Sequence, residues 1–428
     1  MSEKFQNLNY PKVVIVGGGF AGLELAKKLS NKPVLVYLID KHNYHTFQPL
    51  LYQVATGGLG SDSIGYPLRK VIGPMPNVAY RMAQVTAINS KEKCLETNVG
   101  KFHYDMLVLA TGSTTNYFGN KELEALTMPI KSISQALDIR SYFLQEFEKA
   151  LTEQSISTRE ETLNFVIVGA GPTGVELAGA MAEIRKNVMP HDYRELDPKH
   201  MRIHLVEAGT RVLAAMSEKS SAAAHKFLQD MGVEVHLNTM VTAYDGRELK
   251  LKGHESLLAE TVIWSAGVMG DMPSGLPEDK IIRGNRIRVN AFAQVEGEED
   301  IYAIGDIAAM VSDDYPQGHP MVASVAVQQG PWLGENILRR LKQKEAKPFI
   351  YKNKGAMATI GRNRAVVDLP FMFLKGWIAW YIWMFVHLLL LVSFRNRLIV
   401  FVNWAWNYLS YERAIRLIIR PYTKKYPN

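Results

Sequence analysis

One short pattern occurs twice in the chain: an apolar run, a glycine-rich turn and a helical pattern. The first copy reads KVVIVGGGFAGLELAKKLS and the second NFVIVGAGPTGVELAGAMAEI. The glycines are Gly17, Gly19 and Gly22 in the first turn and Gly169, Gly171 and Gly174 in the second. Such glycines permit a tight turn, close approach of a pyrophosphate to the backbone, and close packing of strand and helix. The pattern predicts an α/β protein with two Rossmann-like dinucleotide-binding domains.

An acidic residue ends the strand that follows each turn. Asp40 closes PVLVYLID and Glu207 lies in MRIHLVEAG. Acids at this position accept hydrogen bonds from a ribose diol and repel a 2′-phosphate, so Glu207 favours NADH over NADPH. Arg211, four residues later, leaves that preference open. Two sites imply two dinucleotides, one bound FAD and one exchanging nicotinamide, NADH.

The composition excludes several other functions. The chain has 428 residues, 47% hydrophobic and 21% charged, which is ordinary for a globular protein. Its net charge of +7 suits an anionic membrane, an anionic ligand or nucleic acid. Nucleic acid is the weakest of the three, because the first 370 residues contain no basic run with interleaved aromatics. The single cysteine, Cys94, allows no disulfide or CxxC pair. The start of the sequence lacks a signal-peptide pattern, so we expect the bulk of the chain to stay in the cytoplasm.

The C-terminal region differs from the rest of the chain. Residues 376–394 contain no formal charge, and seven basic residues follow them. They are Arg395, Arg397, Arg413, Arg416, Arg420, Lys424 and Lys425. A single span would place these charges outside, against the positive-inside rule, so we expect a helix that dips into one leaflet and an amphipathic interfacial helix over 411–420. A core helix and a true span remain as alternatives.

Several motifs together resemble a known family. They are the two glycine turns, LVLATG (107–112), IYAIGD (301–306), FQPLLYQVATGGL (47–59), WSAGV (264–268) and the aromatic C-terminus. The chain resembles the two-dinucleotide-binding-domain flavoproteins and, among them, the type II NADH dehydrogenases, over essentially its whole length. That family transfers electrons from NADH through FAD to a quinone without pumping protons. The missing cysteines argue against disulfide and sulfide:quinone reduction.

The resemblance implies roles for individual residues. The FAD site would contain Gly17, Gly19, Gly22, Asp40, Thr111, Gly112 and Asp306. The NADH site would contain Gly169, Gly171, Gly174 and Glu207. Glu176 would lie beside nicotinamide and flavin, and Lys375 would pair with it. Gln328 would approach the quinone, although Ser324 stands where the family often has another glutamine.

For two residues the sequence alone leaves a simpler interpretation. Glu176 also fits a carboxylate favoured by the helix dipole near the start of a helix. His45 fits either a proton donor or an ordinary loop residue. With the resemblance, we favour a charge-managing role for Glu176 and a structural role for His45.

The resemblance also sets the expected organisation. We predict an FAD domain in two parts (1–117 and 285–365), a connecting segment (118–160), an NADH domain (161–284) and a helical membrane-anchoring region (366–428). The expected partners are ubiquinone or menaquinone and an anionic lipid surface, at the cytoplasmic face of the inner membrane. The sequence leaves open whether the protein is a homodimer. A soluble NADH-dependent reductase or oxidase and a non-catalytic NAD/FAD-binding protein remain as alternatives.

Overall fold

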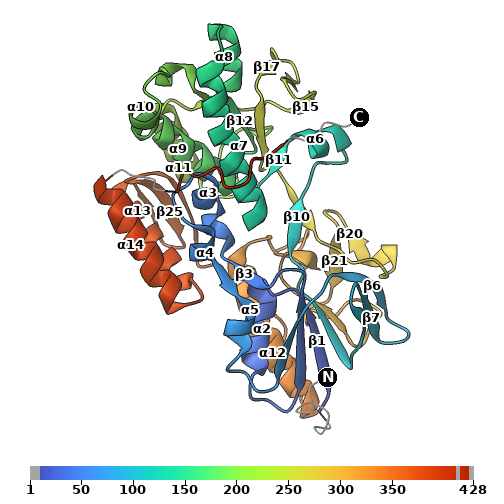
Figure 1. The fold of residues 1–428 in the computed structure, drawn as a ribbon. Coiled ribbons are helices and arrows are strands. Elements are labelled where there is room, and N and C mark those ends of the chain that lie inside the picture. The colour runs from blue at the N-terminus through green and yellow to red at the C-terminus, as the bar shows by residue number, and fades with distance from the viewer. Residues whose placement is uncertain (1–9, 411–414, 424–428) are drawn as a thin grey trace. The chain divides into compact units, whose positions relative to one another are not determined.

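The computed structural model describes residues 10–410 and 415–423 (Figure 1). They form two compact units, each assembled from segments that are distant in the sequence. The first unit comprises Met1–His45, Tyr66–Thr114 and Val268–Asn353, and the second comprises Thr46–Gly65, Thr115–Gly267 and Lys354–Asn428. The predicted functional domains differ from these units in their boundaries, so the assignment of FAD and NADH domains stays a prediction.

A five-stranded parallel sheet forms the centre of the first unit. Its order is β22-β9-β1-β2-β5, and its strands are apolar because both faces are covered. The strands are β1 (Lys12–Val16), β2 (Leu35–Asp40), β5 (Val78–Met82), β9 (Met106–Leu109) and β22 (Ile301–Ala303). Helices α2 (Phe20–Leu29) and α12 (Ala323–Leu341) pack together. A Cβ on Gly330 would lie 2.6 Å from the carbonyl oxygen of Ala21, so this glycine lets the helices approach closely.

Smaller elements complete the first unit. One antiparallel sheet contains β6 (Val85–Asn89), β7 (Cys94–Thr97) and β8 (Gly100–His103). Another sheet contains β20 (Ile281–Ile282), β21 (Arg286–Val289) and β23 (Ala308–Met310). The short helices are α5 (Leu68–Ile72) and the 3₁₀ turn η4 (Gly305–Ile307). Cys94 is fully buried in β7, consistent with a packing role.

The second unit repeats the same architecture. Its parallel sheet has the order β11-β18-β12-β13-β14, and the strand before the glycine turn, β12, is central as β1 is in the first unit. The strands are β11 (Met128–Pro129), β12 (Asn164–Val168), β13 (Arg202–Val206), β14 (Glu234–His236) and β18 (Thr261–Trp264). The main helices are α7 (Ile133–Thr152), α9 (Pro172–Asn187) and α11 (Glu218–Asp230). The predicted pair of Rossmann-like folds is confirmed.

The remaining elements of the second unit are short. A three-stranded sheet contains β15 (Val241–Tyr244), β16 (Glu248–Leu251) and β17 (Leu257–Leu258). The short helices are α3 (Leu51–Ala55), α4 (Ser61–Ile64), α6 (Lys121–Leu126), α8 (Ile156–Thr162) and α10 (Met189–Asp192). Helix α3 packs against α7 and α9, which brings the FQPLLYQVATGGL motif to the end of α9 that follows the glycine turn.

The C-terminal part of the second unit is a small sheet followed by two helices. The antiparallel strands are β24 (Ala356–Gly361), β25 (Arg364–Leu369) and β26 (Met372–Lys375), and the helices are α13 (Trp377–Leu390) and α14 (Phe394–Ser410). A Cβ on Gly179 of α9 would lie 1.6 Å from the carbonyl oxygen of Ile360, so α9 lies directly against β24. Helix α13 packs on the sheet, and α14 packs on α4.

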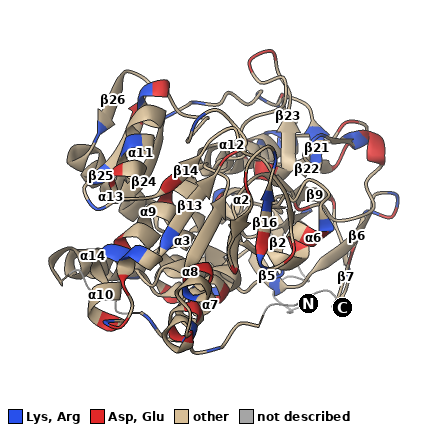
Figure 2. Cartoon of the chain, turned by 90° about the horizontal axis from the view of Figure 1, so that it is seen from above, with Lys and Arg blue, Asp and Glu red and all other residues tan. Residues whose placement is uncertain are grey.

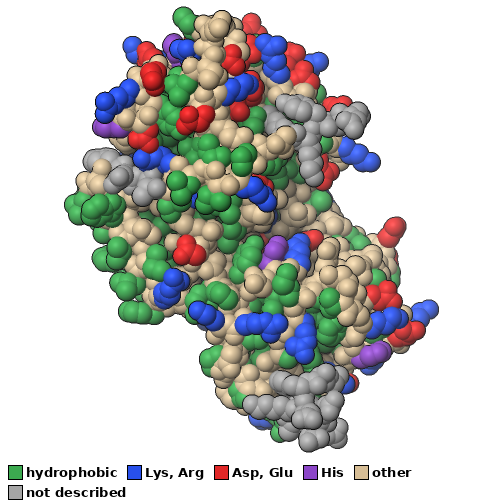
Figure 3. Space-filling view, in the orientation of Figure 1, with side chains coloured by type: hydrophobic (Ala, Val, Ile, Leu, Met, Phe, Trp, Pro, Cys, Tyr) green, Lys and Arg blue, Asp and Glu red, His purple; other side chains and the backbone are tan. Residues whose placement is uncertain are grey.

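One face of α13 and α14 is apolar and exposed, where Figure 3 shows hydrophobic side chains gathered. We call it the apolar face. It consists of Trp377, Ile378, Tyr381, Phe385 and Leu389 on α13 and Phe394, Leu398, Phe401, Trp406 and Leu409 on α14. The two helices contain no acidic residue, and Arg395 and Arg397 are their only lysines or arginines (Figure 2). None of the helices within the described residues combines the length and the apolar composition needed to cross a bilayer.

The prediction of an amphipathic helix over 411–420 was wrong for the part that can be seen. Residues 411–414 lie outside the described residues, and residues 415–423 form no helix. Arg416 forms an ion pair with Asp192 (2.7 Å), and Arg420 forms one with Asp138 (2.6 Å). These arginines are therefore held by carboxylates of their own unit, which the spacing of charges in the sequence could not reveal.

Candidate functional site

The first glycine turn has the geometry that a bound diphosphate requires. Gly17 has φ +107°, and a Cβ there would lie 2.2 Å from the carbonyl oxygen of Ala110. A Cβ on Gly22 would lie 1.9 Å from the carbonyl oxygen of Gly17. A Cβ on Gly19, which caps the N-terminus of α2, would meet no atom within 4 Å. The first and third glycines thus serve packing, and the second leaves open space at a helix N-terminus, where anions are favoured.

Asp40 stabilises this turn. Its Oδ2 accepts the N–H of Gly18 at 2.6 Å, and its Oδ1 accepts the N–H of His42 at 2.7 Å. Burial raises the pKa of Asp40, while the two N–H donors act in the opposite direction. A carboxylate oxygen can accept more than one hydrogen bond, so Asp40 can hold the turn and still accept a ribose hydroxyl.

The other predicted FAD-site residues of the first unit are Thr111, Gly112 and Asp306. Thr111 Oγ1 is buried and has no hydrogen-bond partner among the described residues. Gly112 has φ +76° and open space where a Cβ would be. Ser113 donates to Asp306 Oδ2 at 2.6 Å, joining the turn after β9 to η4. An unsatisfied hydroxyl beside open backbone fits a polar ligand such as the FAD that the sequence predicts.

The second glycine turn repeats the first in detail. Gly169 has φ +100°, and a Cβ there would lie 2.6 Å from Cα of Ala266. A Cβ on Gly174 would lie 1.9 Å from the carbonyl oxygen of Gly169, whereas one on Gly171 would meet nothing within 4 Å. Gly171 caps the N-terminus of α9. The residues present therefore fit a second dinucleotide by the same criterion.

Glu207 takes the place of Asp40 in this turn. Its Oε2 accepts the N–H of Ala170 and its Oε1 the N–H of Gly209, both at 2.7 Å. The guanidinium of Arg211 donates to the carbonyl oxygens of Met216 (2.8 Å) and Ala214 (2.7 Å). Arg211 thus stabilises its own loop, which supports the prediction that Glu207 binds the ribose hydroxyls.

Glu176 lies at the boundary between two cavities of the second unit. It is 7% exposed, and its Oε1 accepts the N–H of Thr359 in β24 at 3.4 Å. Burial raises the pKa of Glu176 to about 8, and the N–H of Thr359 only partly offsets this effect. Glu176 therefore carries a proton at neutral pH, unlike the helix-end carboxylate of the simpler interpretation.

The larger cavity has a volume of about 140 Å³, similar to cavities of about 150 Å³ that accept a benzene ring. Glu176, Tyr52, Trp380, Trp383, Met384 and Trp404 are among its lining residues. The smaller cavity, of about 50 Å³, is lined by residues of the FQPLLYQVATGGL motif, Ile130, Lys131, Thr173 and Glu176. A titratable carboxyl thus faces a cavity about the size of one ring, lined by five aromatic residues and by polar and charged residues such as Glu183 and Arg362.

Two residues beside this cavity were missed at the sequence level. Trp383 is buried, and its ring stacks on that of His387 with centroids 4.1 Å apart. His387 Nδ1 lies 2.8 Å from the carbonyl oxygen of Trp383, and burial lowers the pKa of His387 to about 4. His387 is therefore neutral at pH 7. Both residues lie inside the apolar run of α13. Only their contacts with residues far away in the sequence distinguish them from their neighbours.

The predicted pairing of Lys375 with Glu176 is not found. Lys375 is exposed at the end of β26, and among the described residues no ion pair joins it to Glu176. An exposed ammonium keeps its hydration, whereas the Glu176 carboxyl is buried and is protonated instead.

Gln328 is held by backbone groups of its own unit. Its Nε2 donates to the carbonyl oxygens of Ser324 (2.9 Å) and Lys352 (3.0 Å), and its Oε1 accepts the N–H of Lys352 (3.1 Å). Ser324 Oγ lies 2.8 Å from the hydroxyl of Tyr351. Both side chains fasten α12 to residues 351–352, so their predicted quinone contacts stay predictions.

His45 and Gln329 hold the backbone of the first unit. His45 is 2% exposed, and its Nδ1 lies 2.9 Å from the carbonyl oxygen of Gly18. Since a carbonyl only accepts, Nδ1 carries the proton, in agreement with the structural role that we favoured. Gln329, which the sequence analysis missed, accepts the N–H of Gly305 at 2.7 Å, beside Asp306. No sequence signal separates Gln329 from its neighbour Gln328.

Comparison with known families assigns most of the chain. The pyridine nucleotide-disulphide oxidoreductase family matches residues 11–330, and the NDH2 C-terminal domain matches residues 353–411. The type II NADH:quinone oxidoreductase NdhA of Mycobacterium tuberculosis is 35% identical, over 94% of this chain and 88% of that protein. The type II NADH:quinone oxidoreductase of Haemophilus influenzae is 30% identical, over 85% and 88%.

Solved structures show the same fold. NDH2 from Plasmodium falciparum in complex with NADH has a TM-score of 0.88 at 21% identity, covering 96% of this chain and 100% of that one. The sulfide:quinone oxidoreductase of Aquifex aeolicus has a TM-score of 0.69 at 19% identity, covering 94% and 95%.

Proposed function

The chain belongs to the type II NADH:quinone oxidoreductases, and we infer that it oxidises NADH and reduces a quinone through bound FAD, without pumping protons. Bound FAD would supply the redox chemistry that couples the two-electron oxidation of NADH to the two-electron reduction of the quinone. The observation that supports this function best is the pair of glycine turns, each closed by a strand-terminal acid that accepts two backbone N–H groups.

The first turn and its surroundings hold FAD. The N–H groups at the start of α2 receive the diphosphate in the open space at Gly19, and Asp40 accepts a ribose hydroxyl. Thr111 Oγ1, which has no protein partner among the described residues, donates to a polar atom of the flavin nucleotide. Asp306, fixed by Ser113, accepts hydrogen bonds from hydroxyls of the ribityl chain.

The second turn holds NADH. Gly171 leaves room for the diphosphate at the N-terminus of α9, and Glu207 accepts the ribose hydroxyls. The carboxylate of Glu207 repels a 2′-phosphate, which favours NADH over NADPH.

Glu176 manages a proton. Reduction of a quinone to a quinol consumes two protons as well as two electrons. A carboxyl with a pKa of about 8 is protonated at neutral pH and can release that proton to an acceptor in the adjoining cavity. The aromatic side chains of Trp383, Trp404 and Tyr52 line this cavity and offer faces on which a ring can stack.

The apolar face binds the membrane. Ten large apolar side chains on α13 and α14 are exposed together, which in soluble proteins marks an interaction surface. Arg395 and Arg397 at the start of α14 attract anionic headgroups. We place this surface on the cytoplasmic leaflet, because the enzyme must reach both cytoplasmic NADH and a bilayer quinone. Helices that lie on a leaflet in this way need no crossing segment.

The direct test uses purified, membrane-bound protein. Extracted flavin should be FAD and not FMN, and NADH oxidation should depend on a ubiquinone or menaquinone analogue. A soluble oxidase or reductase would oxidise NADH with oxygen or with a soluble protein acceptor as fast as with the quinone analogue. A non-catalytic binding protein would show bound FAD with no turnover, and either result would overturn the proposed function.

A further inference from the structure

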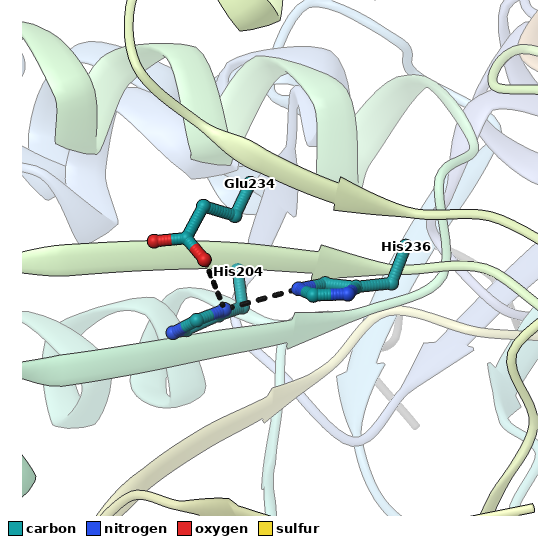
Figure 4. Close-up of side chains that lie close together, drawn as sticks. All are labelled: His204, Glu234 and His236. Carbon is teal, nitrogen blue, oxygen red and sulfur yellow. Dashed lines mark hydrogen bonds and ion pairs between the residues drawn. The ribbon is translucent and has the colours of Figure 1, made fainter. Parts of the chain in front are cut away.

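Three side chains of the second unit converge on one point that the proposed function does not use (Figure 4). His204 lies on β13, and Glu234 and His236 lie on the neighbouring parallel strand β14. Nδ1 of His204 lies 3.1 Å from Nε2 of His236 and 3.5 Å from Oε2 of Glu234. The strand register produces this cluster, because His204 is paired with Glu234 and Val206 with His236.

The three atoms bring several lone pairs, and few protons, to one point. The 3.1 Å contact between the two ring nitrogens accommodates one hydrogen, because two would collide. The carboxylate oxygen supplies none. Three electron-rich atoms that lie within 4.8 Å of one another therefore face a common point with at most one proton between the two rings. A cation at that point would satisfy all three.

We propose that His204 Nδ1, His236 Nε2 and Glu234 Oε2 bind one divalent transition-metal ion of the zinc class, with water as the fourth ligand. Tetrahedral zinc with bonds of about 2.0–2.1 Å keeps its ligand atoms about 3.3 Å apart. The two separations that involve His204 Nδ1, 3.1 and 3.5 Å, lie on either side of that value, and the third lies within 4.8 Å. Two imidazoles and one carboxylate suit zinc better than magnesium or calcium, which prefer oxygen ligands.

The surroundings allow a metal to enter and orient one ligand. His204 is fully buried, whereas the Glu234 side chain is 38% exposed, so the metal enters from the side of Glu234 and His236. Arg202 donates Nε and a terminal nitrogen to the two oxygens of Glu234, at 2.7 and 2.6 Å. This pair fixes the carboxylate and leaves a lone pair of Oε2 for the metal.

The same surroundings limit the affinity. Nε2 of His204 is buried without a hydrogen-bond partner among the described residues. A metal-bound histidine usually donates its other ring N–H to such a partner, and loss of the partner weakens binding about 10–100-fold. The positive charge of Arg202 also opposes a cation. We therefore expect a reversible site rather than a permanently filled structural one.

The site adjoins the second glycine turn but shares no ligand with it. The backbone carbonyl of His236 accepts the N–H of Glu207 at 2.8 Å, while the imidazole of His236 points to the cluster. Because the proposed ligands are not residues of the NADH site, metal binding can be measured independently of NADH oxidation.

The test is a zinc titration of the untagged holoenzyme after chelation and dialysis, in competition with a fluorescent zinc indicator. The wild type should bind one equivalent of Zn²⁺ at this site more tightly than it binds further Zn²⁺ at its other histidines. His236→Ala should weaken that binding at least 10-fold. His103→Ala is the matched control, because His103 is exposed on β8 of the first unit and should leave the titration unchanged.

A second variant keeps the result interpretable if His236→Ala does not fold. Glu234→Gln preserves the size of the side chain and removes the charged ligand, and its fold is checked by circular dichroism and FAD content. It should also lose the tight equivalent. The proposal is overturned if the wild type binds no stoichiometric Zn²⁺, or if folded His236→Ala or Glu234→Gln binds it as tightly as the wild type.

Discussion

Asp40 and Glu207 each serve their unit in two ways. Each carboxylate accepts the N–H of the residue that follows the first glycine of its turn. Each also accepts the N–H of the residue two positions after the acid in the sequence. The donors are Gly18 and His42 for Asp40, and Ala170 and Gly209 for Glu207. The acid that recognises a ribose thus also fixes the turn that receives the diphosphate. Its replacement affects both at once.

Nucleotide preference tests this dual role. The wild type should use NADH about 100-fold better than NADPH in kcat/KM, because opposing Glu207 to a 2′-phosphate costs a few kcal/mol. Glu207→Gln should narrow that ratio and also raise KM for NADH, since an amide cannot accept both N–H groups with its two polar atoms. Steady-state kinetics with both nucleotides checks this. Glu255→Gln, at an exposed loop position, is the control, and equal use of both nucleotides by the wild type would refute the assignment.

Glu176 should set the pH dependence of quinone reduction. Its pKa of about 8 predicts that the rate falls as the pH rises through about 8, because the proton is then lost. Glu176→Gln keeps the shape but holds no transferable proton, so we expect a rate about 100-fold lower without that ionisation. The measurement is a pH profile of quinone reduction at saturating NADH, with the exposed Glu160→Gln as control. An unchanged profile would contradict the role.

The same carboxyl makes a separate prediction about stability. Its pKa rises from 4.5 to about 8 on burial, so between these pH values the folded state holds a proton that the unfolded chain has released. Stability from this group is therefore full below about pH 4.5 and is lost as the pH rises to about 8. Glu176→Gln removes this loss. The Tm of the variant relative to wild type should increase from about pH 5 to about pH 8, as calorimetry would show. A constant difference would mean that the carboxyl is not desolvated.

At the scale of elements, the sequence predicted what depends on neighbours along the chain. The strand, turn and helix of each glycine motif are adjacent in the sequence, and the structure confirms both motifs. Residues 376–394 were treated as one stretch, but α13 ends at Leu390 and α14 begins at Phe394. The hydroxyl of Ser393 accepts the N–H of Asn396 at 3.1 Å, a capping signal that is readable in the sequence.

What the sequence could not show depends on distant partners. The amide of Asn396 donates to the carbonyl oxygens of Asp62 (3.2 Å) and Ser63 (2.9 Å), more than 300 positions away in the chain. The partner of Arg420, Asp138, is 282 residues away. Helical periodicity places a charge on a face but does not say which carboxylate meets it. Arg416 and Arg420 were therefore assigned to an interfacial helix, whereas each forms an ion pair with an aspartate.

The apolar face should bind membranes as a surface of two helices. Phe385 on α13 and Phe401 on α14 are 63% and 53% exposed. Each phenylalanine that enters the bilayer contributes about 1.5–3 kcal/mol. The double substitution Phe385→Glu/Phe401→Glu should therefore weaken binding to anionic vesicles more than 10-fold in a sedimentation assay. Val99→Glu, which changes an apolar residue of the first unit that is 60% exposed, should bind as the wild type does.

At the scale of the whole molecule, the second unit combines three predicted tasks. It contains the NADH turn, the cavity beside Glu176 and the apolar face, while the first unit contains the FAD turn. Removing the C-terminus would therefore disturb several tasks together. A cut after Asp368 falls inside β25, and Asp368 accepts hydrogen bonds from the hydroxyls of Ser217 and Ser220, both at 2.8 Å. Substitutions on the apolar face change membrane binding and leave the NADH turn and the cavity unchanged.

The Phe385→Glu/Phe401→Glu variant should divide two activities of the enzyme. NADH-dependent reduction of ferricyanide should stay near the wild-type rate, because neither side chain lines the cavity or a glycine turn. Reduction of a long-chain quinone in liposomes should fall at least 10-fold, because the acceptor is reached only from the membrane surface. Misfolding would lower both activities together, so their ratio is the quantity to measure. If the variant leaves vesicles but still reduces long-chain quinone at the wild-type rate, membrane attachment through α13 and α14 is not the route to the quinone.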